Sequence, residues 1–327
     1  MSGPIVQDIA PVDLLVVIVN YRTPDLTIQC LESLASQAAD VPGLRAVVTD
    51  NASGDDSVTR IEGAIVARGW GWCRVVPLPR NGGFAYGNNR GIEAGPRARY
   101  VLLLNSDTIV HGHCLRRCVE VMDANPGIGA LSCRLLNRDG TIQNAARRFP
   151  TPWRLTVRAL GLPDKLPRLF AWANLEHPGW DRGAASRDVE WLGGAFLMMR
   201  GDVLAQVGLL DEGFFFYGED IELNHRIKAA GYRRFYDCVE TTTHLGGSSS
   251  DPARMSALAR SEHHWRARYL VQRLCYGALA ERWVRCLDVV THAARGAWHR
   301  VRSGAGSAQC QYHGDVVRTI RGLGART

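Results

Sequence analysis

Leu14–Asn20 reads LLVVIVN, an unbroken run of apolar and largely β-branched residues that ends in a polar side chain. Such a run is typical of a strand buried on both faces, as in a parallel sheet covered by helices. Further strands are predicted over 44–49, 73–77 and 100–104, and helices over 26–38 and 56–67. Strands that alternate with helices indicate βαβ units. The sequence therefore predicts an α/β fold with a mostly parallel sheet flanked by helices.

Polar residues directly follow three of the predicted strands: Asn20-Tyr21, Asp50-Asn51 and Asn105-Ser106-Asp107. Ligands of open parallel sheets bind beyond the carboxyl ends of the strands, which is where these residues should meet. Asp107 ends an apolar strand, and its carboxylate suits a Mg²⁺ or Mn²⁺ ion that also bridges a diphosphate. The alternative interpretation is that Asp107 is a turn residue that caps the next helix.

Two adjacent carboxylates, Glu219 and Asp220, follow Gly218 at the predicted start of a helix over 221–230. Acidic residues at a helix start can reflect the macrodipole alone. The three phenylalanines before them favour a second interpretation, a general base whose pKa is tuned by burial and by its acidic neighbour. His244 precedes a glycine- and serine-rich run, which suggests a ligand beside a loop that orders over bound phosphates. The alternative for His244 is a structural role.

The last part of the chain is basic. Residues 251–327 contain 13 Arg and 5 Asp or Glu, a balance of +8, whereas the whole chain carries +7. Helices are predicted over about 252–302, and the last 25 residues, rich in Gly and Ser, are expected to be loosely ordered. The segment 147–180 is expected to form a covering loop with a short helix or two. The basic tail indicates a phosphate-rich partner, either anionic lipid or nucleic acid.

Several functional classes lack support in the sequence. Residues 1–13 show no basic stretch followed by an apolar core, and the longest apolar runs are too short to cross a bilayer, so a cytoplasmic protein is expected. Nine scattered cysteines indicate reduced thiols. The glycines at 82, 83, 87 and 91 do not fit G-x-G-x-x-G, which argues against NAD binding. The sequence also lacks the P-loop and G-x-S-x-G motifs.

A set of segments, taken together and in order, carries a resemblance to a known family: VVIVNYRTPD, VVTDNASGDDS, NGGFAYGNNRG, YVLLLNSDT, GTIQNAARRFP, EWLGGAFLMMR, GFFFYGEDIEL and HLGGSSS. They span roughly residues 12–250 and resemble the family 2 inverting glycosyltransferases of the GT-A fold, especially the rhamnosyltransferase-like branch. The resemblance implies a glycosyltransferase domain over 1–250, with a nucleotide-sugar half at about 12–135 and an acceptor and catalytic half at about 136–250. A basic helical extension would follow over 251–327.

The resemblance also implies roles for single residues. It implies a nucleotide-sugar pocket formed by Asn20, Tyr21, Asp50, Asn51, Gly83, Asn88, Asn89 and Asn105. It implies a divalent cation, Mg²⁺ or Mn²⁺, on Asp107 and His244, and a general base, Asp220, with Glu219 beside it. Two departures stand out: Asn105 replaces the first acid of the family's D-x-D motif, and Asn88 stands where many relatives carry Arg.

The expected function is a metal-dependent inverting glycosyltransferase that acts in cell-envelope polysaccharide synthesis. The resemblance favours L-rhamnose from dTDP-rhamnose as the donor sugar, with UDP- and GDP-sugars as alternatives, and a hydroxyl of a glycan or lipid-linked saccharide as the acceptor. With such an acceptor, the basic tail is expected to rest on the inner face of the cell membrane rather than on nucleic acid.

Two rival functions fit the sequence less well. A nucleotide-sugar-binding relative without catalysis would have no need of Asp107, Asp220 and His244 together. A nucleotidyltransferase on a similar fold should carry a glycine-rich loop with Arg and Lys after the first strand, whereas residues 21–25 read YRTPD.

Overall fold

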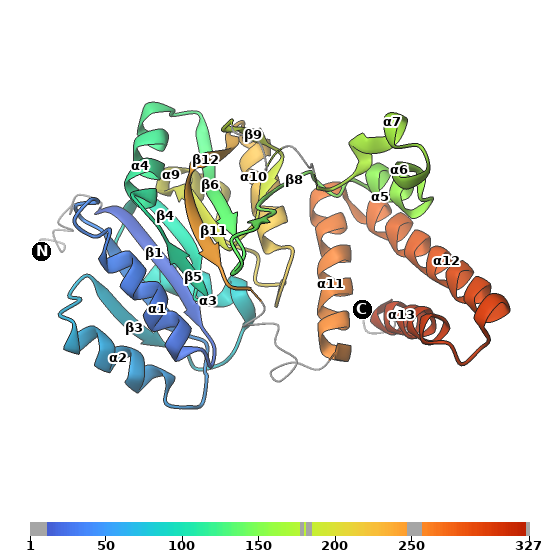
Figure 1. Cartoon of the computed structure of the whole chain (residues 1–327), viewed down its shortest axis with the longest axis horizontal. Helices are drawn as coiled ribbons and strands as arrows, with labels where there is room; N and C mark the ends of the chain where they lie inside the picture. The colour runs from blue at the N-terminus through green and yellow to red at the C-terminus, as the bar shows by residue number, and fades with distance from the viewer. Residues whose placement is uncertain (1–11, 177–179, 181–184, 247–256, 325–327) are drawn as a thin grey trace, which may run out of the picture.

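The computed structural model describes residues 12–176, 180, 185–246 and 257–324. Within these residues a central mixed sheet separates two groups of helices, and a helical C-terminal region packs against one end (Figure 1). The loop that the sequence places over bound phosphates, residues 247–250, lies outside the described residues. No helix in the described part of the chain is long and apolar enough to span a bilayer.

The central sheet has the strand order β3-β2-β1-β4-β11-β6-β12-β5, with β7 beside β6 and β9 beside β12. Its strands are β1 Val12–Asn20, β2 Arg45–Asp50, β3 Cys73–Pro77, β4 Ala98–Asn105, β5 Thr108–Val110, β6 Ile128–Leu136, β7 Ile142–Gln143, β9 Arg187–Val189, β11 Phe196–Arg200 and β12 Arg233–His244. The three pairs that join β3, β2, β1 and β4 are parallel, as is β6 with β12, whereas β11 runs antiparallel between β4 and β6. A separate two-stranded sheet joins β8 Ala146–Arg147 to β10 Trp191–Leu192. The predicted mostly parallel α/β sheet is confirmed.

Helices cover both faces of the sheet: α1 Pro24–Ala35, α2 Ser57–Ala67, α3 Gly83–Ala94, α4 Cys114–Ala124, α9 Gly201–Val207 and α10 Glu219–Ala229. The middle segment forms α5 Pro152–Ala159, α6 Leu162–Lys165, α7 Pro167–Phe170 and the 3₁₀ turn η1 Ala171–Ala173, and the C-terminal region forms α11 Ala257–Tyr276, α12 Ala278–Ser303 and α13 Ala308–Gly324. A covering loop with one or two short helices was expected over 147–180, whereas residues 152–173 form three short helices and a 3₁₀ turn.

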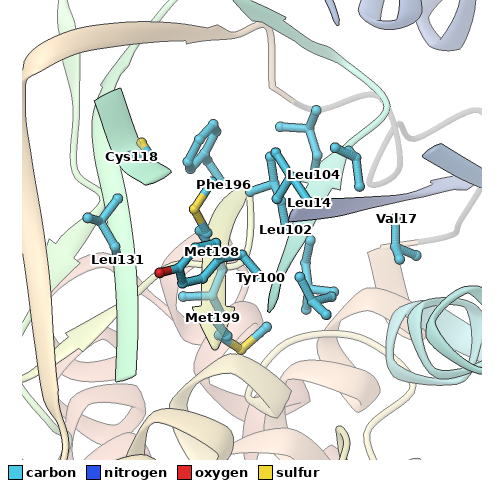
Figure 2. Close-up of a cluster of buried hydrophobic side chains, with 14 of the residues drawn as sticks. Leu14, Val17, Tyr100, Leu102, Leu104, Cys118, Leu131, Phe196, Met198 and Met199 are labelled. Atoms are coloured by element: carbon cyan, nitrogen blue, oxygen red, sulfur yellow. The ribbon is translucent and has the colours of Figure 1, made fainter. Parts of the chain in front are cut away.

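Strand β1 lies at the centre of the main core. Leu14, Val16 and Ile18 are fully buried because β1 lies between β2 and β4 and is covered on both faces. Figure 2 shows part of this core, in which Tyr100 of β4 and Met198 of β11 extend the same buried layer. A continuous apolar run is what such a two-sided position requires.

Helix α3 occupies the glycine- and asparagine-rich segment, to which the sequence analysis assigns no helix. Its glycines recur at every fourth position on the side that faces β1. A Cβ atom on Gly87 would lie 2.8 Å from a methyl of Val19, and one on Gly91 would lie 2.3 Å from a methyl of Val17. The glycines therefore allow the backbone of α3 to approach the strand closely, at the expense of helix propensity.

The expectation of loosely ordered residues at the C-terminus is wrong for the described part of that segment. Residues 308–324 form α13, in which Val316 and Ile320 are buried against the neighbouring helices. Among its small residues this segment contains an apolar stripe of helical spacing, formed by Val316, Ile320 and Leu323. The stripe is buried because α11 and α12 lie beside it.

We expect Gly91→Ala to destabilise the fold by about 1–3 kcal/mol, because β1 must move to admit the new methyl group. The matched control is Gly63→Ala in α2, where nothing lies within 4 Å of the added Cβ. That change should stabilise the protein by up to about 1 kcal/mol through helix propensity. Chemical denaturation of both variants measures this, and equal effects of the same sign would contradict the close packing of α3 on β1.

Candidate active site

A cavity of about 640 Å³ opens at the carboxyl end of the central strands. Five residues that the sequence singled out line it: Asn105, Asp107, Glu219, Asp220 and His244. They come from the end of β4, the turn before β5, the first turn of α10 and the end of β12. The fold thus gathers into one space residues that are more than a hundred positions apart in the chain.

The pairing of β12 with β5 brings His244 to Asp107. The two strands run antiparallel with His244 opposite Thr108, and the Leu245 amide donates to the carbonyl oxygen of Asp107 at 2.9 Å. The His244 Nε2 atom then lies 3.3 Å from the Asp107 Oδ1 atom. The Asp107 side chain is nearly fully buried and that of His244 largely so.

A chain of directional hydrogen bonds fixes the His244 ring. The Thr141 hydroxyl donates to Asp139 at 2.6 Å, so its oxygen accepts from the Asn137 amide at 2.9 Å. The Asn137 oxygen accepts from the Gln143 amide nitrogen at 2.9 Å, which leaves the Gln143 oxygen 2.6 Å from His244 Nδ1. Because that oxygen can only accept, Nδ1 carries a hydrogen.

With the hydrogen on Nδ1, a neutral His244 ring presents a lone pair at Nε2. The Asn105 amide nitrogen lies 3.1 Å from this atom and donates to it, and the Asp107 carboxylate faces it. A lone pair next to a carboxylate attracts a cation, and a ligating histidine that donates its other N–H to an oxygen is a common arrangement. Oxygen and imidazole nitrogen donors together suit Mn²⁺, and the carboxylate suits Mg²⁺.

The protein would contribute few ligands to such a cation. The described residues contain no group of three or more His, Cys, Asp or Glu side chains arranged to hold a metal. Cations of this class commonly bind through one or two protein groups, with water and substrate phosphates completing the coordination. The Asp107–His244 pair fits that kind of site.

The two carboxylates at the start of α10 differ in their surroundings. Asp220 accepts hydrogen bonds from the amides of Gly194, at 3.1 Å, and Ile221, at 2.8 Å, and the guanidinium of Arg147 also favours its charged form. In Glu219, by contrast, Oε2 is buried and has no hydrogen-bond partner. The pair differs in hydrogen bonding even though burial raises the pKa of both groups.

Burial and the neighbouring charge of Asp220 raise the pKa of Glu219 to about 8. Two adjacent carboxylates in a low-dielectric site do not both ionise readily, and the one with more hydrogen-bond donors takes the charge. Of the two, Glu219 therefore holds a proton more readily, and Asp220 carries the negative charge more readily. An ionised carboxylate that lines a cavity can accept a proton from a bound hydroxyl group.

The predicted nucleotide-pocket residues nearest β1 form an internal network. The Asn20 amide donates to Asp50 at 2.7 Å, and its oxygen accepts from Thr27. Asp50 also accepts from the Ser53 hydroxyl at 2.6 Å. These bonds hold the ends of β1 and β2 together. Tyr21 follows, half-buried, with Arg22 packed over its ring. Contact with a nucleotide stays a prediction for these residues.

The remaining predicted pocket residues belong to α3 and its N-terminus. The Asn51 amide donates to the carbonyl oxygen of Gly83 at 3.0 Å, which ties β2 to the start of α3. Asn89 exchanges hydrogen bonds with the main chain of Leu210, and the Asn88 amide donates to a carbonyl one turn earlier in α3. None of these three side chains lines the cavity of the described residues. Their nucleotide-binding roles also stay predictions.

Two contributors to the cavity have no role in the sequence analysis. Gln143 sits in one of the quoted segments, but only the folded β6–β7 hairpin shows that it orients His244. Helix α11 supplies a wall of the cavity through His264, Arg268 and Gln272, although the sequence treats residues 251–327 as a separate extension. Composition gave no signal for this placement, because it depends on how α11 packs on α10.

Comparisons with known proteins agree with this geometry. The sequence profile described as Glycosyl transferase family 2 matches residues 15–173. Low-salt glycan biosynthesis hexosyltransferase Agl10 of Haloferax volcanii is 29% identical over 224 residues, which cover 66% of this chain and 62% of that protein. N-acetylglucosaminyl-diphospho-decaprenol L-rhamnosyltransferase of Mycobacterium tuberculosis is 28% identical over 197 residues, which cover 55% of this chain and 62% of that protein. The matched region thus spans less than two thirds of either relative's length.

Among solved structures, mannosyltransferase PcManGT from Pyrobaculum calidifontis, in complex with GDP-Man and Mn²⁺, has a TM-score of 0.55 to this chain. The two chains are 15% identical, and the superposition covers 97% of this chain and 87% of that one. At this identity the likeness concerns the fold, and it confirms the predicted GT-A architecture with a helical C-terminal region.

The raised pKa of Glu219 predicts a pH-dependent stability. A carboxyl group with a pKa of about 8 in the folded state and near 4.5 when unfolded stabilises the fold below pH 4.5, and this contribution is lost as the pH rises to about 8. Glu219→Gln keeps the shape of the side chain and removes the titration. We expect the free energy of unfolding of the wild type to fall relative to Glu219→Gln over this range, as measured by denaturant titrations. Parallel profiles would contradict a buried, protonated Glu219.

Proposed function

We propose that the chain is a member of glycosyl transferase family 2, in its rhamnosyltransferase-like branch, and that it transfers a sugar from a nucleotide diphosphate donor to a hydroxyl group, with inversion of configuration. One observation carries the proposal: Asp220, which accepts from two main-chain amides, and the Asp107–His244 pair line the same cavity of about 640 Å³. A base and a cation site in one enclosed space are what displacement at a sugar diphosphate requires.

The chain's own residues account for the proposed step. Asp220 accepts the proton of the acceptor hydroxyl while that oxygen bonds to the anomeric carbon of the donor. The bond from this carbon to the diphosphate oxygen breaks, and its electron pair leaves with the nucleoside diphosphate. A divalent cation held by Asp107 and His244 would stabilise the charge of the leaving diphosphate. Burial and the charge of Asp220 raise the pKa of Glu219, which makes it a poor second nucleophile and supports a single displacement with inversion.

We propose dTDP-L-rhamnose as the donor and a lipid-linked saccharide or glycan of the cell envelope as the acceptor. The name of the Mycobacterium tuberculosis relative, which includes a diphospho-decaprenol and an L-rhamnosyl group, supports both parts. The neighbouring structure contains GDP-Man and the Haloferax volcanii relative is a hexosyltransferase, so UDP- and GDP-sugars belong in the same test.

The first test is release of nucleoside diphosphate from a panel of nucleotide sugars, with Mn²⁺, Mg²⁺ or EDTA. We expect one donor to be slowly hydrolysed in a cation-dependent way, and Asp107→Ala to lower the rate by about a hundredfold or more. Asp220→Asn should lower the rate by about 10²–10⁴-fold and still bind the donor, as shown by a shift in melting temperature.

Asp315→Asn, an exposed change on α13, is the matched control and should behave as the wild type. If no nucleotide sugar is hydrolysed and none shifts the melting temperature, the proposal fails. If Asp220→Asn hydrolyses donor as fast as the wild type, Asp220 is not the base.

A second prediction concerns Gln143, which accepts the Nδ1 hydrogen of His244. Gln143→Leu removes this acceptor and frees the ring to adopt the other tautomer, so we expect the affinity for Mn²⁺ to fall about 10–100-fold. Gln143→Glu should restore most of it, because a carboxylate also accepts from Nδ1. Mn²⁺ titrations monitored by electron paramagnetic resonance, with nucleoside diphosphate present, measure the affinity. Gln311→Leu on α13 is the control, and unchanged binding by Gln143→Leu would show that the hydrogen bond does not matter.

A further inference from the structure

Residues 152–173, which form α5, α6, α7 and η1, expose a concentration of large apolar side chains. Trp153 is 65% exposed and Leu169 is 66% exposed. The same short segment also exposes Leu160, Leu166 and Trp172. Exposed single apolar residues are common on protein surfaces, but a group that contains two tryptophans and three leucines within about six turns of chain is a candidate interaction surface.

The exposure does not come from loose packing of the segment. Leu155 and Val157 of α5 are almost fully buried, and Leu155 belongs to the apolar cluster formed by Trp265, Tyr269 and residues of α12 and α13. One side of α5 thus packs against the C-terminal helices, whereas Trp153 lies on the surface. Figure 1 shows α5, α6 and α7 beside α12, on the far side of α11 from the sheet.

Both ends of the segment lie at the catalytic cavity. Pro150, just before it, and Leu175, just after it, line the cavity. The two ends are tied together because the amide of Arg148 donates to the carbonyl oxygen of Leu175 at 2.8 Å. The Gln272 amide of α11 donates to the carbonyl oxygen of Pro150 at 2.8 Å. The exposed apolar residues therefore lie on a helical segment whose two flanking residues both line the cavity.

The charges of this surface are mainly positive. Arg158, Lys165 and Arg168 stand among the apolar residues, against a single carboxylate, Asp164. The start of α12 adds another tryptophan to this surface. The half-exposed Trp283 donates its indole N–H to Thr156 of α5 at 2.8 Å. Tryptophan and leucine mixed with basic residues is the composition of segments that lie in the headgroup region of anionic membranes.

We propose that residues 152–173, whose flanking residues Pro150 and Leu175 line the cavity, together with the adjoining start of α12, dock the protein on the surface of an anionic bilayer. An acceptor anchored in that bilayer would then present its hydroxyl group to Asp220 without leaving the lipid. The lipid-anchored acceptor rests on the proposed function, whereas the membrane contact does not. The surface differs from the sequence expectation, which assigned membrane contact to residues 251–327 as a whole.

The test is flotation of the full chain with vesicles of phosphatidylcholine alone, or with one third phosphatidylglycerol, in the absence of nucleotide sugar. The wild type should bind the anionic vesicles at least about tenfold better than the neutral ones. The double variant Trp153→Ser with Leu169→Ser should lose about tenfold or more of this binding. Its release of nucleoside diphosphate from donor in solution should match the wild type, because neither side chain lines the cavity.

The matched control is Val66→Ser with Val239→Ser, which changes two equally exposed residues on α2 and β12 and should leave vesicle binding unchanged. Wild type that fails to float would overturn the proposal. So would loss of binding by Trp298→Ser with Val301→Ser, both exposed later on α12, when Trp153→Ser with Leu169→Ser still binds. A chain that self-associates through Trp153 and Leu169 and does not bind vesicles would identify a second copy as the occupant and also refute it. Because flotation needs no donor, these outcomes are independent of whether the transferase activity is found.

Discussion

The pairing of β12 with its two neighbours holds the candidate active site together. Parallel to β6 over most of its length, β12 continues past a bulge to pair antiparallel with β5. This extension places His244 at the Asp107 carboxylate and supports the hairpin that carries Gln143. A shift of one residue in that register would turn the His244 side chain to the other face of the sheet and remove it from the cavity.

Acidic and imidazole side chains of the cavity form two separate pairs, Asp107 with His244 and Glu219 with Asp220. The proposed cation site has an oxygen donor from Asp107, in the turn before β5, and a nitrogen donor from His244, at the end of β12, whereas the carboxylate pair sits at the start of α10. Hydrogen bonds from the main chain stabilise the charge of Asp220, and their absence at the buried Oε2 of Glu219 favours a proton there. Main-chain hydrogen bonds and the Arg147 guanidinium thus favour the charge on Asp220 over the charge on Glu219.

The C-terminal region is part of the site rather than an appendage. Helix α11 lines the cavity and α5 packs into the apolar cluster of α11, α12 and α13, so the segment between Pro150 and Leu175 connects the cavity to the exposed surface. Charge counting along the sequence located the basic residues correctly. It could not show that the exposed tryptophans and leucines of the middle segment would stand beside them.

The apolar run of β1 and the alternation of strands and helices were enough to predict the sheet, since both are local patterns of hydrophobicity. The polar residues after the strands and the two carboxylates of α10 pointed to the edge of the sheet where the cavity opens, although ligand binding there stays a prediction. The sequence did not predict helices α3 and α13. The glycines of α3 disfavour a helix but allow its backbone to pack closely on β1. The apolar stripe of α13 is buried only because α11 and α12 lie beside it. The orientation of His244 by Gln143, the unequal protonation of Glu219 and Asp220 and the place of α11 in the cavity were decided by tertiary structure alone. Each depends on groups distant in sequence meeting in a fixed geometry, which a linear pattern of residues does not specify.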